Sequence, residues 1–483
     1  MVVARYSHGQ LVIIDRLREM VRLAAGVEEN GRIDKEVAGR ALACLERFGQ
    51  RLRDMHADSV RVVGTNALRV AHRKQAFLER AREALGHPIE IISGMEEARL
   101  IYSGVAHTMP SEPGRRFVVD IGGGSTELII GEGLTPLELE SLQMGCVSLS
   151  ERFFRDGKIS AKRVDRARVA ARLELEPVQA AFRRRGWDRC AGSSGTVRAI
   201  GEVIHEIDAQ QQMITTGGLE QVIKYLVDAG HVRELRLASI TEDRRPVFPG
   251  GTVILAAIFD VLGLEKMQIA EGAMREGLLY DMVGRFMDED ARERTIRAMQ
   301  QRYHVDPAQG DRVEATVLDF LEQTREVWRL SDPLADLSLK WAARLHEIGL
   351  DVSHSGYHRH GAYLLENADM PGFPRGEQRL LARLVGCHRR KFAIEGLEEL
   401  IPPWDRSALY LIVLLRLAVL LHRGRSASAL PAITLTPSFR SLEIEFPGKW
   451  LKEHPLTSAD LQQETEQLAV TGFRLRVFSR GGK

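Results

Sequence analysis

Residues 117–130 read Phe-Val-Val-Asp-Ile-Gly-Gly-Gly-Ser-Thr-Glu-Leu-Ile-Ile: an apolar run ending in Asp120, a glycine-rich turn, and a second apolar run carrying Glu127. Two strands that flank such a turn form a hairpin, and the exposed backbone N–H groups at its tip suit phosphate oxygens. The alternative is an ordinary tight hairpin in which the glycines supply positive φ angles. Because that alternative leaves both strand-end acids unexplained, the stretch favours phosphoryl chemistry, with Asp120 and Glu127 placed to hold a metal ion.

Length and composition are typical of a soluble protein with several domains. The chain has 483 residues, of which 44% are hydrophobic and 28% charged, enough for about three or four domains. Its net charge of +1 gives no basic excess that would indicate nucleic-acid or membrane binding. The four cysteines show no paired spacing, and the most apolar stretch, Leu409–Leu421, is broken by Arg416 and too short to span a bilayer. With no signal-peptide pattern at its start, we expect a cytoplasmic protein without a membrane span.

The predicted elements follow a repeated order. From residue 116, apolar patterns predict strands at about 116–119, 126–130 and 137–142, and the whole segment reads βββαβαβα. The segment before it reads ββαβαβα and opens with a hairpin of Val2–Tyr6 and Leu11–Ile14. The first segment is therefore one strand short of the second.

Two helix starts in the first segment carry candidate residues. Glu96 and Glu97 fall in the first turn of a helix, where the helix dipole stabilises carboxylates, so ordinary charge-capping is the simpler reading of this pair alone. The stretch Val62–Arg69 is a strand that runs into a helix start, where backbone N–H groups and the Arg69 guanidinium could receive an anion. A plain strand-to-helix connection remains an alternative there.

Six segments together resemble one known family. They read VVGTNALR, IISGMEEARL, DIGGGSTELIIG, MGCVSLSERFF, AGSSGTVRA and EGAMREGLLYDM. The set resembles the exopolyphosphatase and guanosine pentaphosphate phosphohydrolase family, and the likeness runs essentially from Met1 to the C-terminus. The run LHEIGLDVSHSGYHRH looks closer to the long, four-domain bacterial exopolyphosphatases.

The resemblance implies an α/β fold with two actin-like (ribonuclease H-like) domains that form a cleft, followed by an all-α HD-like domain and a small β-rich C-terminal domain. The corresponding ranges are 1–109, 110–287, 288–423 and 424–483. It also implies a homodimer. These are expectations from the family, since no interface can be identified in the sequence.

The resemblance also implies roles for individual residues. Glu97 matches a general base that activates water against the terminal phosphorus, and Asp120 and Glu127 match acids that hold Mg²⁺ directly or through water. The residues expected to bind phosphate are Gly122, Gly123, Gly124, Ser125, Arg69 and Thr65. A general base, a metal ion and phosphate-binding groups together suit phosphoryl transfer, which needs charge neutralisation and an aligned nucleophile.

The family carries a first phosphate loop of the form Asp-x-Gly-Ser-x-Ser, and this sequence has none before Val2. We expect that the start of the chain is annotated downstream of the true one. A chain that really begins at Met1 is expected to be unstable and nearly inactive.

The C-terminal half contains most of the histidines. The region resembles a metal-dependent HD-type domain, but the expected His-Asp pair is His346-Glu347 and the later run LLRLAVLLH lacks an aspartate, which disfavours a catalytic metal. A basic track for a long polyphosphate is the favoured interpretation, with surface and helix-capping charges as the alternative. The track residues are Arg244, His354, His358, Arg359, His360, Arg389, Arg390 and Lys391.

The sequence thus predicts a Mg²⁺-dependent exopolyphosphatase that releases orthophosphate processively from the ends of inorganic polyphosphate. Guanosine pentaphosphate 5′-phosphohydrolase is the alternative within the same class. A catalytically impaired sensor of polyphosphate or nucleotides is the alternative of a different class, expected if the first phosphate loop is truly absent.

Overall fold

The computed structural model describes residues 1–480 except 8–9, 20, 22, 28–29, 111, 287–289, 392–395 and 427. It divides into two compact units, Met1–Asp290 and Ala291–Lys483, which are described separately below. The four domains predicted from the sequence stay a prediction, because this division separates two units only. Part of the predicted hairpin turn, residues 8 and 9, lies outside the described residues.

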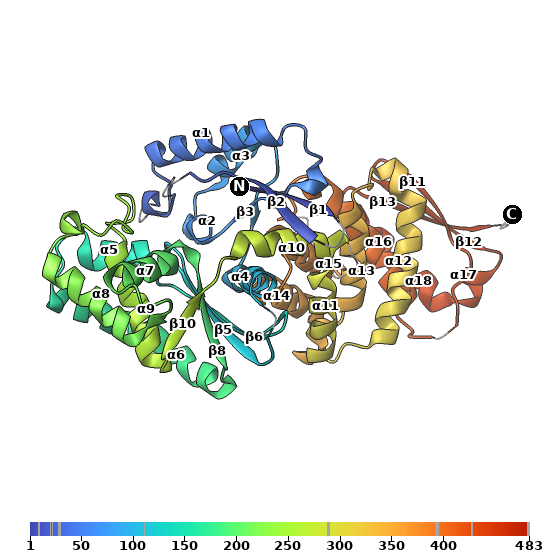
Figure 1. Ribbon diagram of the computed structural model, residues 1–483. Helices are drawn as coiled ribbons and strands as arrows, with labels where there is room; N and C mark the ends of the chain where they lie inside the picture. The colour runs from blue at the N-terminus through green and yellow to red at the C-terminus, as the bar shows by residue number, and fades with distance from the viewer. Residues whose placement is uncertain are drawn as a thin grey trace. The chain divides into compact units, whose positions relative to one another are not determined.

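The first unit contains both strands and helices (Figure 1). Its strands are β1 (Val2–Ser7), β2 (Gln10–Arg16), β3 (Val63–Gly64), β4 (Glu90–Ile91), β5 (Arg115–Ile121), β6 (Thr126–Glu132), β7 (Thr135–Leu142), β8 (Arg189–Ser193), β9 (Ile214–Thr215) and β10 (Lys266–Ile269). Its helices are α1 (Lys35–Leu52), α2 (Asn66–Val70), α3 (Gln75–Leu85), α4 (Gly94–Thr108), α5 (Cys146–Phe154), α6 (Ala161–Arg185), α7 (Ser194–Ile207), α8 (Thr216–Ala229), α9 (Phe248–Leu262) and α10 (Met274–Phe286).

The main sheet has the strand order β7-β6-β5-β8-β10-β9. Strand β5 pairs antiparallel with β6 and parallel with β8, so it joins the hairpin to the parallel strands. Successive side chains of a strand point to opposite faces. Phe117 and Val119 of β5 pack with helices α5–α9, whereas Val118 packs with α4 on the other face. Burial on both faces explains why β5 is a continuous apolar run.

Helix α4 is held against α10 by two glycines. A Cβ atom on Gly277 would lie 1.8 Å from the Leu100 carbonyl oxygen, and one on Gly104 would lie 2.0 Å from the Ala273 carbonyl oxygen. No other residue permits this backbone approach. The glycines therefore fix α4, and with it Glu97, between α10 and the main sheet.

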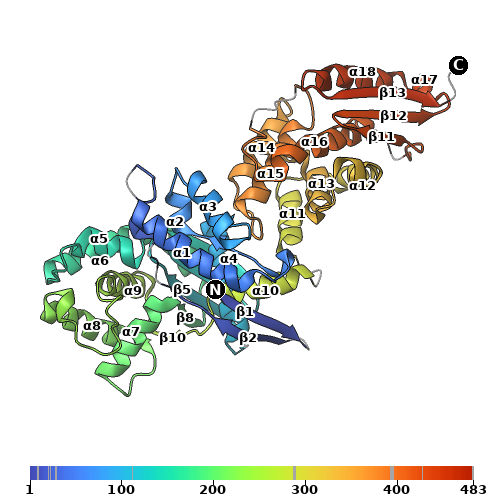
Figure 2. The same ribbon diagram turned by 90° about the horizontal axis from the view of Figure 1, so that it is seen from above.

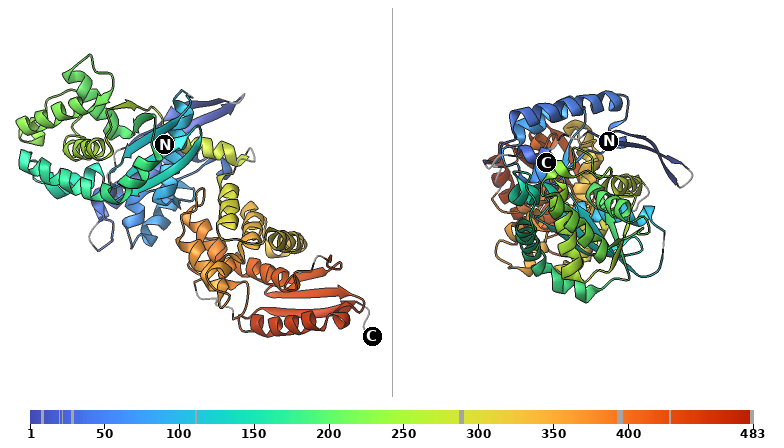
Figure 3. Two further views of the ribbon diagram at one scale, coloured as in Figure 1. Left: turned by 90° about the horizontal axis from the view of Figure 1, so that it is seen from below. Right: turned by 60° about the vertical axis from the view of Figure 1, so that its left-hand side comes forward.

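The first part of this unit has a different sheet arrangement. Strands β1 and β2 form an antiparallel hairpin, and β3 and β4 form a separate parallel pair. Figure 3 shows the hairpin as a two-stranded ribbon of its own, in dark blue. In the part of the chain that the structure describes, no strand joins the two pairs as β5 joins β6 to β8. The stretch Val62–Arg69, which the sequence predicts to be a strand that runs into a helix, forms a strand only at Val63–Gly64 before α2 begins at Asn66.

The second unit is helical and ends in a small sheet. Its helices are α11 (Ala291–Arg302), α12 (Pro307–Trp328), α13 (Pro333–Leu345), α14 (Tyr357–Asn367), α15 (Arg375–Cys387), α16 (Trp404–Leu421), α17 (Trp450–Glu453) and α18 (Pro455–Ala469), and its strands are β11 (Thr434–Ser438), β12 (Ser441–Pro447) and β13 (Arg474–Arg480). Figure 2 shows α18 running along the sheet of order β11-β12-β13. The strands agree with the predicted β character of this segment, whereas α17 and α18 were not predicted.

Helix α16 is the buried helix expected from the apolar stretch at Leu409–Leu421. Its Arg416 is 1% exposed and donates to both carboxylate oxygens of Glu464 in α18 and to the Cys387 carbonyl oxygen. The charge is thus paired inside the core, as a buried arginine requires. Within the described ranges, no helix has both the length and the apolar character needed to cross a lipid bilayer.

Candidate active site

Glu97 lies buried in the first turn of α4. The helix begins there because the Ser93 hydroxyl accepts a hydrogen bond from the Glu96 N–H at 3.1 Å. Arg69 of α2 donates from Nη1 to Glu97 Oε2 at 2.8 Å and to the Ile92 carbonyl oxygen at 3.1 Å. Burial raises the pKa of Glu97 above its ordinary value, and the Arg69 charge opposes that rise.

Asp120 and Glu127 lie opposite each other at the ends of β5 and β6. They are register partners in the antiparallel pair, so their side chains share one face of the sheet. The Ser193 hydroxyl donates to Asp120, and the Ser141 hydroxyl donates to Glu127 Oε1 at 2.9 Å. Both carboxyl groups are buried, so each depends on these donors for polar contact.

The three carboxyl groups lie close enough to influence one another. Burial raises the pKa of Asp120 to about 6, the Ser193 hydrogen bond opposes the rise, and the Glu97 charge adds to it. Burial also raises the pKa of Glu127 well above its usual value, with further rises from the charges of Glu97 and Asp120. A buried group of like charges is unfavourable without a cation.

The carboxylates Asp120 and Glu127 fit a hard divalent cation. Mg²⁺ prefers oxygen ligands and commonly takes one or two carboxylates, with waters and substrate phosphates completing its shell. Across the described ranges, no group of three or more His, Cys, Asp or Glu side chains is arranged to hold a metal ion alone. The residues therefore fit a Mg²⁺ held by two carboxylates and completed by other oxygens, and do not fit a closed structural site.

The glycine-rich turn between β5 and β6 is fixed by hydrogen bonds within the turn and to the start of α5. The Gly122 N–H donates to the Ser125 carbonyl oxygen at 2.9 Å, which closes the turn, and the carbonyl oxygens of Gly122 and Gly123 accept from the N–H groups that begin α5. The N–H groups of Gly123 and Gly124 donate to no described residue. With its carbonyls engaged, the turn keeps these N–H groups available for an anion, so its role in phosphate binding stays a prediction.

The turn faces α2, which brings Asn66 into the site. A Cβ atom on Gly124 would lie 2.3 Å from Asn66 Oδ1, so a larger residue would displace the Asn66 side chain or the turn. Thr65 is the residue that caps α2, and its hydroxyl makes no capping hydrogen bond. Arg69 Nη2 is buried and has no hydrogen-bond partner among the described residues. A donor of this kind suits a phosphate oxygen.

Sequence reasoning missed three residues that the structure adds to the site: Asn66, Ser141 and Ser193. Ser141 and Ser193 hold the two candidate metal-binding carboxylates, and Asn66 contacts the phosphate turn. Asn66 and Ser193 lie in the quoted segments VVGTNALR and AGSSGTVRA, so those segments contained the signal. Ser141 lay in no quoted segment, and only the pairing of β7 with β6 identifies it.

Glu96, the neighbour of Glu97, has a structural role. Its carboxylate accepts two hydrogen bonds from Arg99, at 2.7 and 2.8 Å, and Arg99 also binds Asp281 of α10. Arg61 donates to the same Asp281 and, at 3.0 Å, to Glu90. This buried network ties α4 to α10, so Glu96 is engaged in packing whereas Glu97 pairs with Arg69.

Most residues of the predicted polyphosphate track gather in the second unit around one cavity of about 1670 Å³. Those that line it are His354, His358, Arg359, Arg389, Arg390 and Lys391. His360 is on α14 but does not line the cavity. The structure thus brings together six of the eight track residues.

Arg244 belongs to the first unit. Its guanidinium packs on Gly195 at the start of α7, where a Cβ atom would lie 2.1 Å from Arg244 Nη2. Burial lowers the pKa of Arg244, and the nearby Arg18 charge lowers it further.

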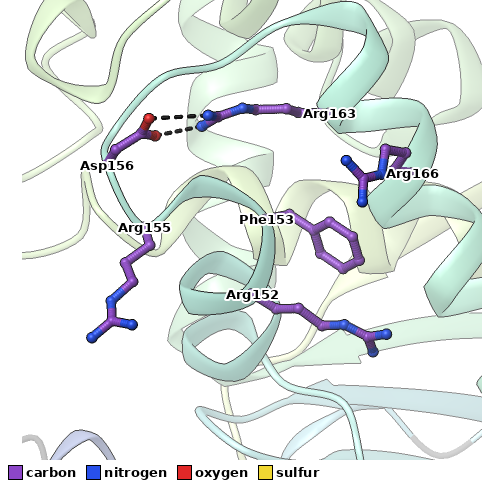
Figure 4. Close-up of a pocket in the computed structure, with 6 residues that line it drawn as sticks. All are labelled: Arg152, Phe153, Arg155, Asp156, Arg163 and Arg166. Carbon is purple, nitrogen blue, oxygen red and sulfur yellow. Dashed lines mark hydrogen bonds and ion pairs between the residues drawn. The ribbon is translucent and has the colours of Figure 1, made fainter.

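A smaller cavity of about 360 Å³ lies between α5 and α6 (Figure 4). It is lined by Arg152, Phe153, Arg155, Asp156, Arg163 and Arg166, and Figure 4 shows Arg163 paired with Asp156. None of the predicted site residues lies there, so the candidate site remains the carboxylate cluster and the glycine turn.

Comparison with protein families matches the chain along most of its length. Residues 2–286 match the Ppx/GppA phosphatase family, and residues 291–465 match Ppx/GppA phosphatase, domain III. The chain belongs to the Ppx/GppA phosphatase family. This confirms the family predicted from the six segments and the prediction that the chain is a hydrolase of phosphoric anhydrides.

Two curated relatives of this Ppx/GppA chain carry the name guanosine-5′-triphosphate,3′-diphosphate pyrophosphatase. The protein of Vibrio vulnificus is 40% identical over 480 residues, covering 99% of this chain and 96% of the relative. The protein of Aeromonas hydrophila is 39% identical over 477 residues, with 99% and 96% coverage. The structure of an exopolyphosphatase from Cytophaga hutchinsonii is similar with a TM-score of 0.52 at 24% identity, over 58% of this chain and 93% of that one. The last likeness shows the fold alone.

Proposed function

We propose that the chain hydrolyses the terminal 5′-phosphoanhydride bond of guanosine 5′-triphosphate 3′-diphosphate. The observation that carries the chemistry is the group of Glu97, Asp120 and Glu127 beside a glycine turn with available N–H groups. The substrate is proposed from the names of full-length relatives at 39 and 40% identity. This reverses the order of the two substrates predicted from the sequence, in which polyphosphate came first.

In this proposal, Glu97 accepts the proton of the attacking water. A carboxyl group whose pKa is raised by burial is a stronger base once ionised, which suits proton transfer near neutral pH. Arg69 holds Glu97 in place from one nitrogen, and its Nη2 is available to a phosphate oxygen of the substrate. The N–H groups of the glycine turn and the Thr65 hydroxyl receive the other phosphate oxygens.

Bound Mg²⁺, held by Asp120 and Glu127, would offset the negative charge of the phosphates and of the carboxylates. Ser193 and Ser141 orient those two carboxylates. An anionic base and an anionic substrate can then share one cleft.

Inorganic polyphosphate is the second candidate substrate. The observation that favours it is the basic cavity of the second unit, where six predicted track residues gather. Repeated charged contacts along a polyphosphate chain would favour retention of the substrate between cleavages.

We further propose that the protein acts in the cytoplasm as a homodimer, with two actin-like domains and an HD-like third domain.

The test measures orthophosphate release from guanosine 5′-triphosphate 3′-diphosphate and from long-chain polyphosphate, with and without Mg²⁺. We expect a higher kcat/KM for the nucleotide and a loss of activity when the metal is chelated. The Glu97→Gln variant should lose about 100-fold or more in kcat on both substrates. Glu83→Gln, an exposed carboxylate of α3, is the control. A higher kcat/KM for polyphosphate would make polyphosphate the preferred substrate, as the sequence predicts. Binding of either compound without phosphate release would favour a catalytically impaired sensor.

A further inference from the structure

The cavity of the second unit contains buried imidazoles that a bare phosphate chain does not match. His346 and His388 both line it, and their exposed fractions are 1% and 2%. The volume of about 1670 Å³ exceeds that of a usual small-molecule pocket, so a ligand of nucleotide size can enter.

Hydrogen bonding fixes the tautomer of each histidine. His388 Nδ1 lies 2.5 Å from the Val385 carbonyl oxygen, and His346 Nδ1 lies 2.7 Å from the Ala343 carbonyl oxygen. A carbonyl oxygen only accepts, so both Nδ1 atoms carry the proton. In the neutral ring, Nε2 then presents a lone pair. Burial lowers the pKa of both histidines, which keeps the rings neutral.

The lone pair of His388 lacks a donor. Its Nε2 is buried and makes no hydrogen bond to any described residue, and the same holds for His358 Nδ1. The ring of His388 has the rings of His346, Tyr357 and His358 around it, at centroid distances of 5.5 to 6.2 Å. A buried acceptor without a donor is costly unless a ligand or water supplies one.

Cations line other parts of the same cavity. In the part of the chain that the structure describes, Arg359, Arg389, Arg390 and Lys391 form no ion pair with an aspartate or glutamate. The guanidinium of Arg389 lies 4.5 Å from the centroid of the Tyr357 ring. Other arginines of the cavity are paired, such as Arg423 with Asp460 and Arg425 with Glu347. The unpaired cations therefore suit the phosphates of a ligand.

We propose that this cavity binds a nucleoside polyphosphate, with its phosphates on the unpaired cations and an N–H or O–H donor of its base or ribose on the His388 lone pair. An inorganic polyphosphate offers anionic oxygens but no such donors, because its interior phosphates carry no proton. The site is separate from the proposed catalytic residues, all of which lie in residues 1–290. Ligand binding in this cavity can therefore be tested even if the proposed substrate of the catalytic residues proves wrong.

The experiment compares GDP with pyrophosphate by titration calorimetry on the full chain, and maps the bound ligand by hydrogen exchange. We expect GDP to bind about tenfold or more tightly than pyrophosphate, the effect of at least one matched hydrogen bond. GDP should also protect the backbone amides of α14 and α15. In His388→Phe, which keeps the ring volume but removes the acceptor, the preference for GDP should disappear while pyrophosphate affinity is kept. His454→Phe, at an exposed position outside the cavity, is the matched control.

A second pair of variants covers the case in which His388→Phe does not fold. Arg389→Ala should weaken GDP binding and the protection of α14 and α15, whereas Arg406→Ala, at an exposed position outside the cavity, should change neither. Equal affinity for GDP and pyrophosphate would overturn the proposal. Titrations in buffers of different ionisation enthalpy count the protons taken up on binding. Uptake of about one proton would then indicate a bare phosphate chain bound to a protonated histidine. Absence of protection in α14 and α15 would overturn the proposal as well.

Discussion

Arg69 and Glu97, which come from α2 and α4, form an ion pair at 2.8 Å in the candidate active site. The pair has two opposed consequences, because Arg69 positions the carboxylate while its charge lowers the pKa that burial raises. The strength of the base is therefore set by the balance of these two effects, and the balance can be changed one residue at a time.

Replacing Arg69 should move the pH dependence of catalysis. In Arg69→Gln the pKa of Glu97 loses its main lowering influence and rises further. The base acts only when ionised, so the acidic limb of kcat/KM should shift to higher pH by about 1 unit. The measurement is a pH profile of phosphate release, with Arg73→Gln, an exposed neighbour, as control. An unmoved limb would show that Glu97 is not the group that titrates.

Neutralising Asp120 should stabilise the metal-free protein while abolishing metal dependence. Burial raises the pKa of Asp120 from 3.8 to about 6. Its contribution to stability is thus largest below pH 3.8 and is lost as the pH rises through about 6, a loss of about 3 kcal/mol. Asp120→Asn should therefore unfold at a higher temperature than wild type in EDTA at pH 7.5, and gain less from added Mg²⁺.

Thermal unfolding with and without Mg²⁺ checks this expectation. Asp165→Asn, an exposed carboxylate of α6, serves as the matched control and should behave like wild type. If Asp120→Asn and wild type gain equal stability from Mg²⁺, Asp120 does not hold the metal.

The phosphate turn can be probed through its contact with Asn66. In Gly124→Ala the new Cβ atom would lie 2.3 Å from Asn66 Oδ1, so the Asn66 side chain or the turn must shift. Because small displacements of phosphate-binding groups are costly to catalysis, kcat/KM should fall about tenfold or more. Gly39→Ala in α1 is the control, since a Cβ atom there meets nothing within 4 Å. Equal activity of the two variants would remove Gly124 from the phosphate site.

The network around Glu96 should affect stability and not the chemical step. Glu96→Ala leaves Arg99 buried with one acidic partner fewer, a change that costs about 3 to 5 kcal/mol in buried ion pairs. The exposed pair Glu36–Arg40 is the control, and Glu36→Ala should cost less than about 1 kcal/mol. Urea unfolding measures both, and a small loss for Glu96→Ala would contradict the structural assignment.

The sequence predicted β5 and β6 closely because both strands are buried on both faces. The range 116–119 lies inside β5, and the range 126–130 lies inside β6. In the last segment, the alternating stretches at residues 441–446 and 473–477 predict strands and correspond to β12 and β13. Helix α18 was missed because its few apolar positions give a weak helical pattern. Partners such as Ser141 and Ser193 were missed for a different reason. Their hydrogen bonds join residues 14 and 73 positions apart, which local patterns do not reveal.

The separate strand pairs of the first part lead to the last prediction. In the main sheet β5 lies between β6 and β8 and carries the phosphate turn at its end, whereas the pairs β1-β2 and β3-β4 have no described strand between them. Unpaired strand edges of this kind accept a further strand. Adding upstream residues that form a strand and an Asp-x-Gly-Ser-x-Ser turn should join the two pairs and supply further phosphate donors.

We expect the extended chain to unfold at a higher temperature and to release phosphate faster than the 483-residue chain. An extension of equal length in which the Asp, Gly and Ser residues of the turn are replaced by Ala is the matched control. It tests whether the strand alone restores stability, because hydrogen bonds along β1 and β3 need only backbone groups, while faster phosphate release needs the turn. Equal activity of the two extended chains would show that the turn takes no part in catalysis.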